Sequence, residues 1–453
     1  MCPEIFSGLF AHGAVSAQLD DRAWIRAMLD FEAALAAAGA EVGIVPAEAA
    51  REIENLCASA EPNSATLGEG SGKQGTPVPA LLAALRADLS PEASAHLHRG
   101  ATSQDVVDTA AMLVTHRALV PLLEELDGAA DACAALAERH RETLQIGRTL
   151  LQQAAPTTFG LTAAGWLVAL DESATRLRET REHTLAVQLG GAVGTLSSLG
   201  EYGMAVAAGV AQRLELVEPT LPWQSDRTRP ALLAAALGAC CGTAGKIATD
   251  VVLLAQTEVA EVAEGGGGGG SSTLPHKRNP VAAITARACA ARTPGLVATM
   301  LAAMSVEHQR AAGGWQAEAQ TLSELLALTG SATAAVRSLL EGLEVRPERM
   351  RANLELTDGL VMGEALTTAL TESLGREQAH ELVEQASRDA HARGASLREI
   401  VAGVPEIAAA LGEDGIDAAL EPTAYLGSSD ELIYRALAAH RALADQRTST
   451  QEP

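Results

Sequence analysis

The sequence is poor in aromatic residues and in lysine. Aromatic side chains make up 2% of the 453 residues, and lysine occurs only at Lys73, Lys246 and Lys277, so arginine supplies the other 30 basic residues. The formal net charge is -24. Such a chain lacks the basic surface and the stacking platforms with which proteins bind nucleic acid, and an anionic membrane surface would repel it. We expect no nucleic-acid or membrane partner, and any anionic ligand must meet positive charge that is concentrated locally.

Signatures of metal, cofactor and nucleophile sites are also missing. No HExxH or acidic cluster accompanies His96 and His98, no GxSxG elbow is present, and no dinucleotide fingerprint follows a strand. The six cysteines form no CxxC pair, so we expect reduced, mostly buried thiols. No uncharged apolar run reaches the roughly 18 residues of a membrane span, and the N-terminal residues lack a leader pattern. The sequence predicts a cytoplasmic protein that needs no metal or organic cofactor.

Helix-forming residues dominate what is present. Ala and Leu are frequent and β-branched alternation is scarce. The pattern predicts long helices over residues 22–41, about 102–141, about 158–189, about 230–264 and about 280–328. We expect Pro121 to kink or divide the second of these long helices, and Pro294 to bend the last. Because these segments are apolar nearly all round, each helix needs neighbours on most sides. We therefore expect an all-α bundle of long helices in an oligomer whose subunits share the bundle.

The pattern divides the chain into three regions. An N-terminal helical region is expected over 1–100, a central long-helix bundle over 101–344, and a set of shorter helices over 345–453. The central region contains an unusual loop at 265–280, where six glycines precede the sequence SSTLPHKRNP. A glycine run is also typical of a flexible linker. Because two hydroxyls, two cations and an amide follow it directly, we expect this loop to close over an anionic ligand.

Two further polar segments could bind an anion. The sequence HRGATSQD places Thr102 and Ser103 where a helix N-terminus would offer N–H groups and a positive dipole to a carboxylate. The same residues also fit plain helix capping, with Asp105 completing a variant of the capping box. Residues 147–160, GRTLLQQAAPTTFG, form a polar stretch with helix breakers, which also suits an ordinary connection. The segment at 222–230 has the character of a surface loop.

Together these segments resemble the signature regions of the fumarase/aspartase superfamily. GSSTLPHKRNP at 270–280 is similar to the signature loop usually written GSSxMPxKxNP, with Leu274 in place of Met. TSQD at 102–105 and GRT…PTTFG at 147–160 match the other two regions in the same order. Within the superfamily the chain is similar to the 3-carboxy-cis,cis-muconate cycloisomerase family. That similarity extends over HRGATSQDVVDTAAML, VQLGGAVGTLSSLG, EHQRAAGGWQAE and the C-terminal helices.

The resemblance implies an all-α fold, a homotetramer and active sites that are each built from three subunits. It also implies addition or elimination beside a carboxylate of a small polycarboxylate substrate, through a doubly charged aci-form that needs donors aimed at its oxygens. The catalytic residues would be Ser271, as acid or base, with Lys277 and Asn279. The substrate-binding residues would be Arg99, Thr102, Ser103, Thr149, Gln153 and Ser272.

The chain lacks a histidine that related families carry, and this difference limits which reaction it can catalyse. Adenylosuccinate lyases typically carry His where this chain has Leu150 and Gln153, and neither residue shuttles a proton at neutral pH. Lactone formation needs one proton delivered to carbon, because the substrate's own carboxylate attacks. The departure therefore favours a cycloisomerase that forms 4-carboxymuconolactone, in the protocatechuate branch of the β-ketoadipate pathway.

Other functions remain open at this point. The same departure suits a lyase that expels a stable anion, such as a nitrosuccinate lyase releasing fumarate, because that leaving group needs no acid. It suits an adenylosuccinate lyase less. Two alternatives from other classes are a helical scaffold without activity and an anion-binding module with a hinged lid. Intact Ser271, Lys277 and Asn279 argue against the scaffold.

Overall fold

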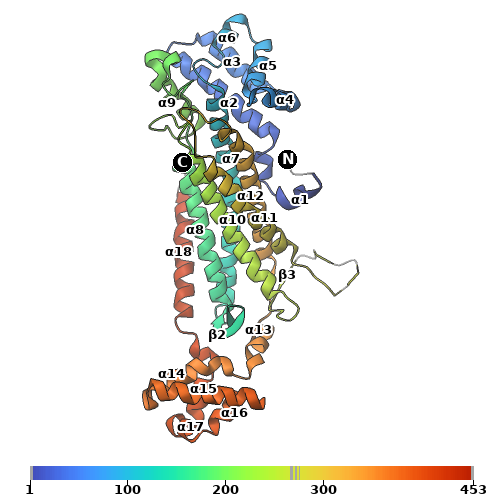
Figure 1. The fold of residues 1–453 in the computed structure, drawn as a ribbon, viewed down its shortest axis with the longest axis vertical. Helices are drawn as coiled ribbons and strands as arrows, with labels where there is room; N and C mark the ends of the chain where they lie inside the picture. Colours follow the sequence, from blue (N-terminus) through green and yellow to red (C-terminus); the bar gives the residue numbers. More distant parts are fainter. Residues whose placement is uncertain (1–3, 266–268, 271–272, 275, 450–453) are drawn as a thin grey trace. The chain divides into compact units, whose positions relative to one another are not determined.

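The computed structural model describes residues 4–265, 269–270, 273–274 and 276–449. Over these residues the chain forms eighteen α-helices, short 3-10 helices and two small two-stranded sheets, which confirms the predicted all-α class (Figure 1). The chain falls into two units: unit 1 comprises 1–128, 172–248 and 282–337, and unit 2 comprises 129–171, 249–281 and 338–453. The sequence-based division into three consecutive regions stays a prediction.

The helices fall into three groups by length and position. The shorter helices of unit 1 are α1 (Ser7–Phe10), α2 (Asp21–Glu41), α3 (Ala47–Ser59), α4 (Ser64–Gln74), α5 (Val78–Asp88), α6 (Pro91–His96) and α9 (Gly203–Leu214). Long helices with residues in both units are α7 (Ser103–Arg139), α8 (Phe159–His183), α10 (Thr228–Leu254), α11 (Val281–Ala302) and α12 (Glu318–Glu341). Unit 2 also holds α13 (Pro347–Leu354), α14 (Gly363–Leu374), α15 (Arg376–Arg393), α16 (Leu397–Ala402), α17 (Pro405–Ala419) and α18 (Ser429–Ser449).

Within unit 1, glycines let the long helices α10 and α11 approach closely. A Cβ atom added to Gly238 would lie 2.7 Å from Val297 Cγ2, and one added to Gly245 would lie 2.5 Å from Ala290 Cβ. These two glycines are seven residues apart, so they lie on the same face of α10. A larger residue at either position would push the two helices apart, and the bundle depends on both glycines.

The sequence predicts the bounds of α2 and α7 well and overextends α8 and α10. Helices α2 and α7 agree with the predicted helices at 22–41 and about 102–141. Helix α8 ends at His183 rather than near residue 189, and α10 ends at Leu254, ten residues before the predicted end. Helical propensity is continuous through these ends, so tertiary contacts rather than local sequence decide where the helices end.

The predicted helix over about 280–328 is wrong, because residues 303–317 divide it into α11 and α12. The break contains His308 and Gly313, whose φ angles of 49° and 112° are incompatible with a right-handed helix. The prolines do not make the break: Pro294 lies inside α11 and Pro121 lies inside α7. Neither helix is divided at its proline, so of the two outcomes expected for Pro121 division is excluded, and a kink stays a prediction.

Unit 2 contains the strands that the sequence did not predict. Strand β1 (Leu144–Thr149) pairs antiparallel with β2 (Gln152–Thr158), and β3 (Val262–Glu264) pairs antiparallel with β4 (Leu343–Val345). Helices α14 to α17 enclose their own hydrophobic cluster, which includes the fully buried residues Leu366, Leu370, Leu397 and Ile407.

The described cysteines behave as the sequence predicts. Cys57, Cys133, Cys240, Cys241 and Cys289 are free and buried. Burial raises the pKa of the Cys57 thiol to about 12, so it stays protonated and unreactive at neutral pH. Cys2 lies outside the described residues.

Among the residues that the structure describes, two helices, α7 and α10, are long and apolar enough to cross a membrane by length and composition. Of their most apolar stretches, 78% and 61% are buried inside the structure. Core helices of soluble proteins meet the same criterion, and no membrane protein is indicated.

Candidate active site

The structure distributes the predicted site residues over both units. Arg99, Thr102 and Ser103 lie in unit 1, at and before the start of α7. Four others lie in unit 2, namely Thr149, Gln153, Lys277 and Asn279. Ser271 and Ser272 lie outside the described residues, and so does part of the loop that was expected to close over a ligand.

A buried carboxylate organises the start of α7. Asp105 is fully buried, and its oxygens accept from Thr102 N at 3.0 Å, Gly190 N at 3.1 Å, Gly191 N at 2.9 Å and Gln188 Nε2 at 2.9 Å. Burial raises the pKa of Asp105 to about 6, although these hydrogen bonds favour the charged form. The network fixes the backbone of the TSQD segment against residues 188–191.

Only half of the predicted capping box forms. The Asp105 carboxylate accepts from Thr102 N, as expected, but the Thr102 hydroxyl accepts from Arg310 Nη1 at 3.0 Å. The hydroxyl proton of Thr102 is then still available to an acceptor. Ser103 is half-buried, and exposed Arg99 places Nη1 3.1 Å from His96 Nδ1.

Arg310 is a site residue that sequence reasoning missed. Besides Thr102, its guanidinium donates to Ala192 O at 3.0 Å and to Gly191 O at 3.5 Å. Within the described part of the chain, none of the acceptors found for Arg310 is a carboxylate. A guanidinium that is not neutralised, beside the free N–H groups of a helix start, suits an anionic ligand.

The segment at 222–230 is only partly a surface loop as predicted: Ser225, Asp226 and Thr228 are exposed, whereas Arg227 and its neighbours Trp223 and Gln224 are buried. Arg227 is buried and forms ion pairs with Asp108 and Glu318, and Asp108 also accepts from Trp315 Nε1 at 2.9 Å. The guanidinium of Arg227 also lies 4.9 Å above the ring of Trp223. Complete pairing makes burial of these charges tolerable. The cluster packs one turn below Asp105 on α7 and supports the site without offering free charge.

The GRT segment forms the β1–β2 hairpin. Gly147 lies at a register shift between the strands, where a Cβ would lie 2.9 Å from Ala155 O. The two-residue turn consists of Leu150 and Leu151, both with positive φ (52° and 64°) as in a type I′ turn. Thr149 precedes the turn and is exposed, so its hydroxyl is accessible to a ligand.

Gln153 is held by the fold. It pairs with Arg148 in the hairpin register, and its Nε2 donates to Asn353 O at 2.9 Å. Its Oε1 is buried, and no protein partner is found for it. The amide therefore has at most one donor hydrogen and one acceptor oxygen left for a ligand.

The signature loop closes on itself through Asn279. Both the backbone N and the Nδ2 of Asn279 donate to Gly269 O at 3.0 Å. Gly269 has a φ of 76°, and a Cβ there would lie 2.1 Å from Asn279 O, so only glycine fits. Lys277 is exposed next to this closure. The predicted donor role of Asn279 thus coexists with a structural role within the loop.

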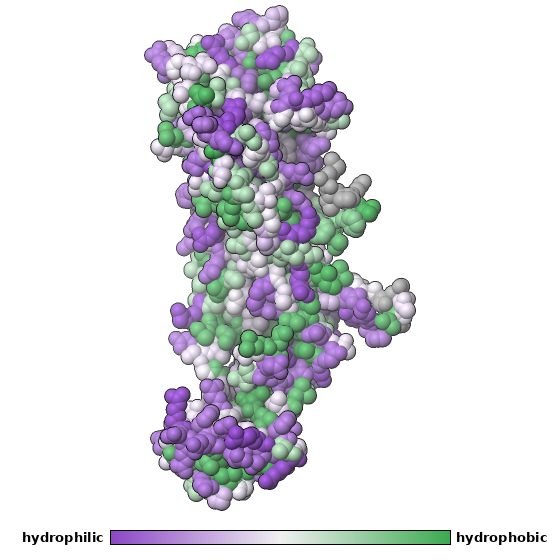
Figure 2. Space-filling view, in the orientation of Figure 1, coloured by the Kyte–Doolittle hydropathy of each residue, from purple (hydrophilic) through white to green (hydrophobic). Residues whose placement is uncertain are grey.

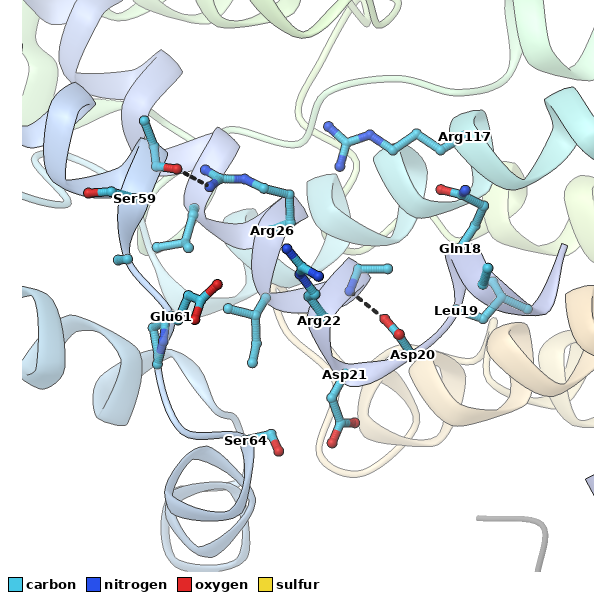
Figure 3. A pocket seen from close by; sticks show the side chains of 17 residues that line it. Gln18, Leu19, Asp20, Asp21, Arg22, Arg26, Ser59, Glu61, Ser64 and Arg117 are labelled. Carbon is cyan, nitrogen blue, oxygen red and sulfur yellow. Dashed lines mark hydrogen bonds between the residues drawn. The ribbon is translucent and has the colours of Figure 1, made fainter. Parts of the chain in front are cut away.

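A cavity of about 1360 Å³ in unit 1 lies elsewhere (Figure 3). It is lined by the start of α2 and the end of α3, with Arg22, Arg26 and Arg117 around it. Arg26 and Arg117 both pair with Asp30 at 2.8 and 2.6 Å, so one carboxylate is shared between two of these three cations. None of the predicted site residues lines this cavity, and we do not assign the activity to it.

Comparison with known proteins identifies the family. The lyase family profile matches residues 11–295, and the profile described as "Adenylosuccinate lyase C-terminus" matches residues 359–436. The 3-carboxy-cis,cis-muconate cycloisomerase of Bradyrhizobium diazoefficiens is 45% identical over 96% of this chain and 97% of its own length. The nitrosuccinate lyase of Streptomyces davaonensis is 41% identical over 96% and 94%.

The crystal structure of the 3-carboxy-cis,cis-muconate lactonizing enzyme from Pseudomonas putida superposes with a TM-score of 0.91 at 39% identity, covering 98% of this chain and all of the other. The chain belongs to the fumarase/aspartase lyase superfamily. The assignment made from the signature segments is confirmed, and the protein is an enzyme of this superfamily.

Superfamily membership explains why sequence reasoning found some residues and missed others. Thr102, Thr149 and Lys277 stand in the signature segments, where the resemblance assigns roles. Arg310 stands in EHQRAAGGWQAE, a segment similar to the family for which the motifs give no role. An arginine in that segment was the available signal, but its contact with Thr102, more than 200 positions away, depends on the fold.

Proposed function

We propose that the protein is a 3-carboxy-cis,cis-muconate cycloisomerase, which converts its substrate into 4-carboxymuconolactone without a cofactor. The hairpin carries this proposal. Leu150 is 97% exposed at its tip, and the amide of Gln153 is tied to Asn353. These are the positions at which adenylosuccinate lyases typically carry His, and neither side chain transfers protons at neutral pH. The reaction must therefore need few proton transfers, which favours lactone formation.

Lactone formation balances with a single proton. A carboxylate oxygen of the substrate forms a C–O bond to an alkene carbon, and the π electrons move to the carbon beside another carboxylate, which becomes the aci-form. The Ser271 hydroxyl, as the acid, then delivers a proton to that carbon. Lys277 supplies positive charge and Asn279 an amide donor near the developing charge, where preorganised donors stabilise an intermediate most.

The remaining predicted residues would bind the substrate's carboxylates. Thr102 and Ser103 offer hydroxyls at the start of α7, and Arg310 adds a positive charge beside Thr102 that the motifs do not assign. Thr149 presents an exposed hydroxyl on the hairpin. Arg99, Gln153 and Ser272 are further partners in this proposal, with Ser272 contributing from the signature loop.

We propose a cytoplasmic homotetramer with active sites shared between subunits. Large apolar side chains are exposed on the unit 1 parts of the long helices: Val120 on α7, Leu232 on α10, and Ile284 and Leu301 on α11. Figure 2 shows apolar surface on the face it presents over these helices. Apolar residues exposed on bundle helices suit contact with further helices.

A nitrosuccinate lyase is the second candidate, because a relative with that name is 41% identical over nearly the whole chain. Nitrite leaves without an acid, so the same hairpin serves that reaction. The two candidates differ in product: one gives a lactone and consumes a conjugated triacid, whereas the other releases fumarate and nitrite.

The test is a parallel assay of purified protein on 3-carboxy-cis,cis-muconate and on nitrosuccinate, with Ser271→Ala as the blank. We expect a loss of ultraviolet absorbance from the conjugated triacid, with the lactone identified by NMR. A higher kcat/KM on nitrosuccinate, with stoichiometric nitrite, would replace the proposal by the second candidate. No turnover of either compound would contradict both.

A further inference from the structure

Glu261 lies between α10 and β3 and is fully buried. Its carboxylate accepts four hydrogen bonds: Oε2 from Gln145 Nε2 at 3.0 Å and Arg148 Nη1 at 3.1 Å, and Oε1 from Asn353 Nδ2 at 2.8 Å and from Arg148 Nη2. A carboxylate offers about four acceptor positions, so all of them are used. Through these bonds Glu261 connects β1, which carries Gln145 and Arg148, with α13, which carries Asn353.

The backbone around Glu261 is fixed as well. Ala260 has a φ of 52°, a conformation that residues other than glycine keep only where their surroundings hold it. Glu261 N donates to Leu254 O, and Glu261 O accepts from Arg346 N, both at 2.9 Å. From the opposite side, Asn353 Nδ2 also donates to Val259 O at 2.8 Å. The chain therefore leaves α10 on one defined path into β3.

The two strands next to Glu261, β1 and β3, each continue into a segment of the candidate active site. Strand β1 continues from Arg148 directly to Thr149, the exposed hydroxyl of the hairpin. Strand β3, paired with β4, is the stem from which the chain enters the signature loop with Lys277 and Asn279. A single buried carboxylate thus sits at the base of both segments that unit 2 contributes.

We propose that Glu261 is a positioning residue of the active site. Its carboxylate fixes the Thr149 hairpin and the stem of the signature loop to one framework, and it neutralises Arg148 so that this cation does not bind the substrate. Glu261 itself touches no substrate. The inference rests on the proposed function only in treating the hairpin and the loop as parts of active sites.

The first test compares Glu261→Gln with Asp171→Asn as a matched control. Asp171 is another buried carboxylate of unit 2; it pairs with His440 at 3.0 Å and shares no partner with Glu261. In Glu261→Gln the new amide NH2 group faces donors that the carboxylate accepted from, and two donors cannot hydrogen-bond each other. The β1–β2 hairpin should therefore shift, and KM should rise. Because the hydrogen bond from Thr149 to a charged carboxylate would be weakened or lost, we expect a rise in KM of roughly 10–100-fold, with a much smaller change in kcat.

A merely structural role would give a different result. Partial unfolding lowers the active fraction, so kcat per total protein falls while KM stays at its wild-type value. We expect that pattern from Asp171→Asn. An unchanged KM in Glu261→Gln, together with wild-type hydrogen exchange over residues 144–158, would overturn the proposal.

The second test is a double-mutant cycle, and its single variant Arg148→Met also tests the link if Glu261→Gln fails to fold. Arg148→Met removes the partner whose side chain is 23% exposed and leaves Glu261 its hydrogen bonds from Gln145 and Asn353; this variant should raise KM by itself. Glu261→Gln and Arg148→Met break the same ion pair, so their effects on kcat/KM should not add in the double variant. The effects of Glu261→Gln and Asp171→Asn, which break separate contacts, should add. Full additivity of the first pair would contradict a shared link.

Failure of this inference can be told from failure of the proposed function. If wild-type protein prefers nitrosuccinate, the proposed substrate is wrong, yet the same KM comparison made with nitrosuccinate still tests Glu261. If the wild type turns over neither compound, exchange protection of residues 144–158 in Glu261→Gln against Asp171→Asn decides the positioning role without any substrate: selective loss in Glu261→Gln supports it, and equal protection overturns it.

Discussion

Asp105 in unit 1 and Glu261 in unit 2 are both fully buried carboxylates that accept four hydrogen bonds beside a predicted substrate-binding residue. They differ in their donors. Asp105 accepts only from amides, and burial raises its pKa to about 6. Glu261 receives two of its four hydrogen bonds from Arg148. The charge of Glu261 is therefore balanced by the guanidinium of Arg148, whereas none of the four hydrogen-bond donors to Asp105 carries a charge.

This difference determines whether positive charge is available to a ligand at the start of α7 and at the β1–β2 hairpin. At the start of α7 the nearby cation, Arg310, binds a hydroxyl and carbonyls, so its charge remains for an anion. At the hairpin the nearby cation, Arg148, is neutralised by Glu261, and the ligand would meet the neutral hydroxyl of Thr149. We infer that the Thr102 end supplies charge and that the hairpin supplies shape and hydrogen bonds.

The largest expected effect on activity comes from Ser271 rather than from Asp105 or Glu261. Ser271→Ala should lower kcat by about 10²–10⁴-fold, the contribution of a positioned acid or base, with ligand affinity nearly unchanged. Lys277→Ala should raise KM and lower kcat together, because its charge acts in the ground state and more strongly in the transition state. Steady-state kinetics with binding of an unreactive tricarboxylate would separate the two. Retained turnover in Ser271→Ala would remove it from the mechanism.

The next effect tests the difference between the two cations. Arg310→Met should raise KM by about 10–100-fold, since a hydrogen bond to a charged group contributes about 1.5–3 kcal/mol. Arg229→Met is the matched control, because Arg229 also donates to carbonyls, Thr184 O at 2.8 Å and His183 O at 3.3 Å, and has no place in the site. Equal KM values in the two variants would show that Arg310 binds no substrate.

Asp105→Asn should affect stability more than any surface change. The introduced N–H group would face two of the four donors, and leaving buried donors without acceptors costs about 1–3 kcal/mol each. We therefore expect a loss of about 2–6 kcal/mol in the free energy of unfolding, measured by urea denaturation. Denaturation indistinguishable from wild type would show that the donors find other acceptors.

The pH dependence of the same residue has a definite sign. The folded pKa of Asp105 lies above its ordinary value of 3.8, at about 6, so the folded state holds this proton more tightly. The contribution of Asp105 to stability should fall as pH rises from about 4 to about 6, and should be level above that. The difference in the free energy of unfolding between wild type and Asp105→Asn, measured over this pH range, gives the contribution of Asp105 alone. A difference that grows with pH would contradict the raised pKa of Asp105.

The smallest effect concerns the C-terminal helix α18. His440 lies between Asp171 and Asp131, with both ring nitrogens at 3.0 Å from a carboxylate oxygen, and the hydrogen bond to Asp171 raises the pKa of His440 above 6.5. Its stabilising contribution is complete below pH 6.5 and is lost as pH rises through the folded pKa. Melting temperatures of wild type and His440→Gln should converge at alkaline pH. A constant difference would contradict this titration.

Sequence patterns predicted the fold class and the segments that carry the site, because both depend on local features. Ala- and Leu-rich runs specify helices, and the signature segments are contiguous motifs. The 303–317 break was not predicted, although the pair Gly313-Gly314 within it was an available turn signal; the positive φ angles at His308 and Gly313 then interrupt the helix. The β1–β2 hairpin was missed because Leu150–Leu151 is not a usual turn sequence.

The supporting residues of the site could not be predicted for a different reason. Glu261 stands in QTEVAEVAE, where nothing distinguishes it from Glu258 or Glu264. Its role depends on Arg148 and Asn353, which are about 100 positions away on either side. Arg227 was placed in a surface loop for the same reason, since its carboxylate partners come from other helices.

A complementation experiment tests most directly the claim that one chain supplies its segments to different active sites. Ser271→Ala and Thr149→Ala proteins are each unfolded, mixed in equal amounts and refolded, with mixed oligomers verified by native mass spectrometry. If sites are shared, random assortment leaves about a quarter of them intact, so the mixture should recover up to about that fraction of wild-type activity. A mixture that stays as inactive as its parents, while demonstrably mixed, would contradict the shared site.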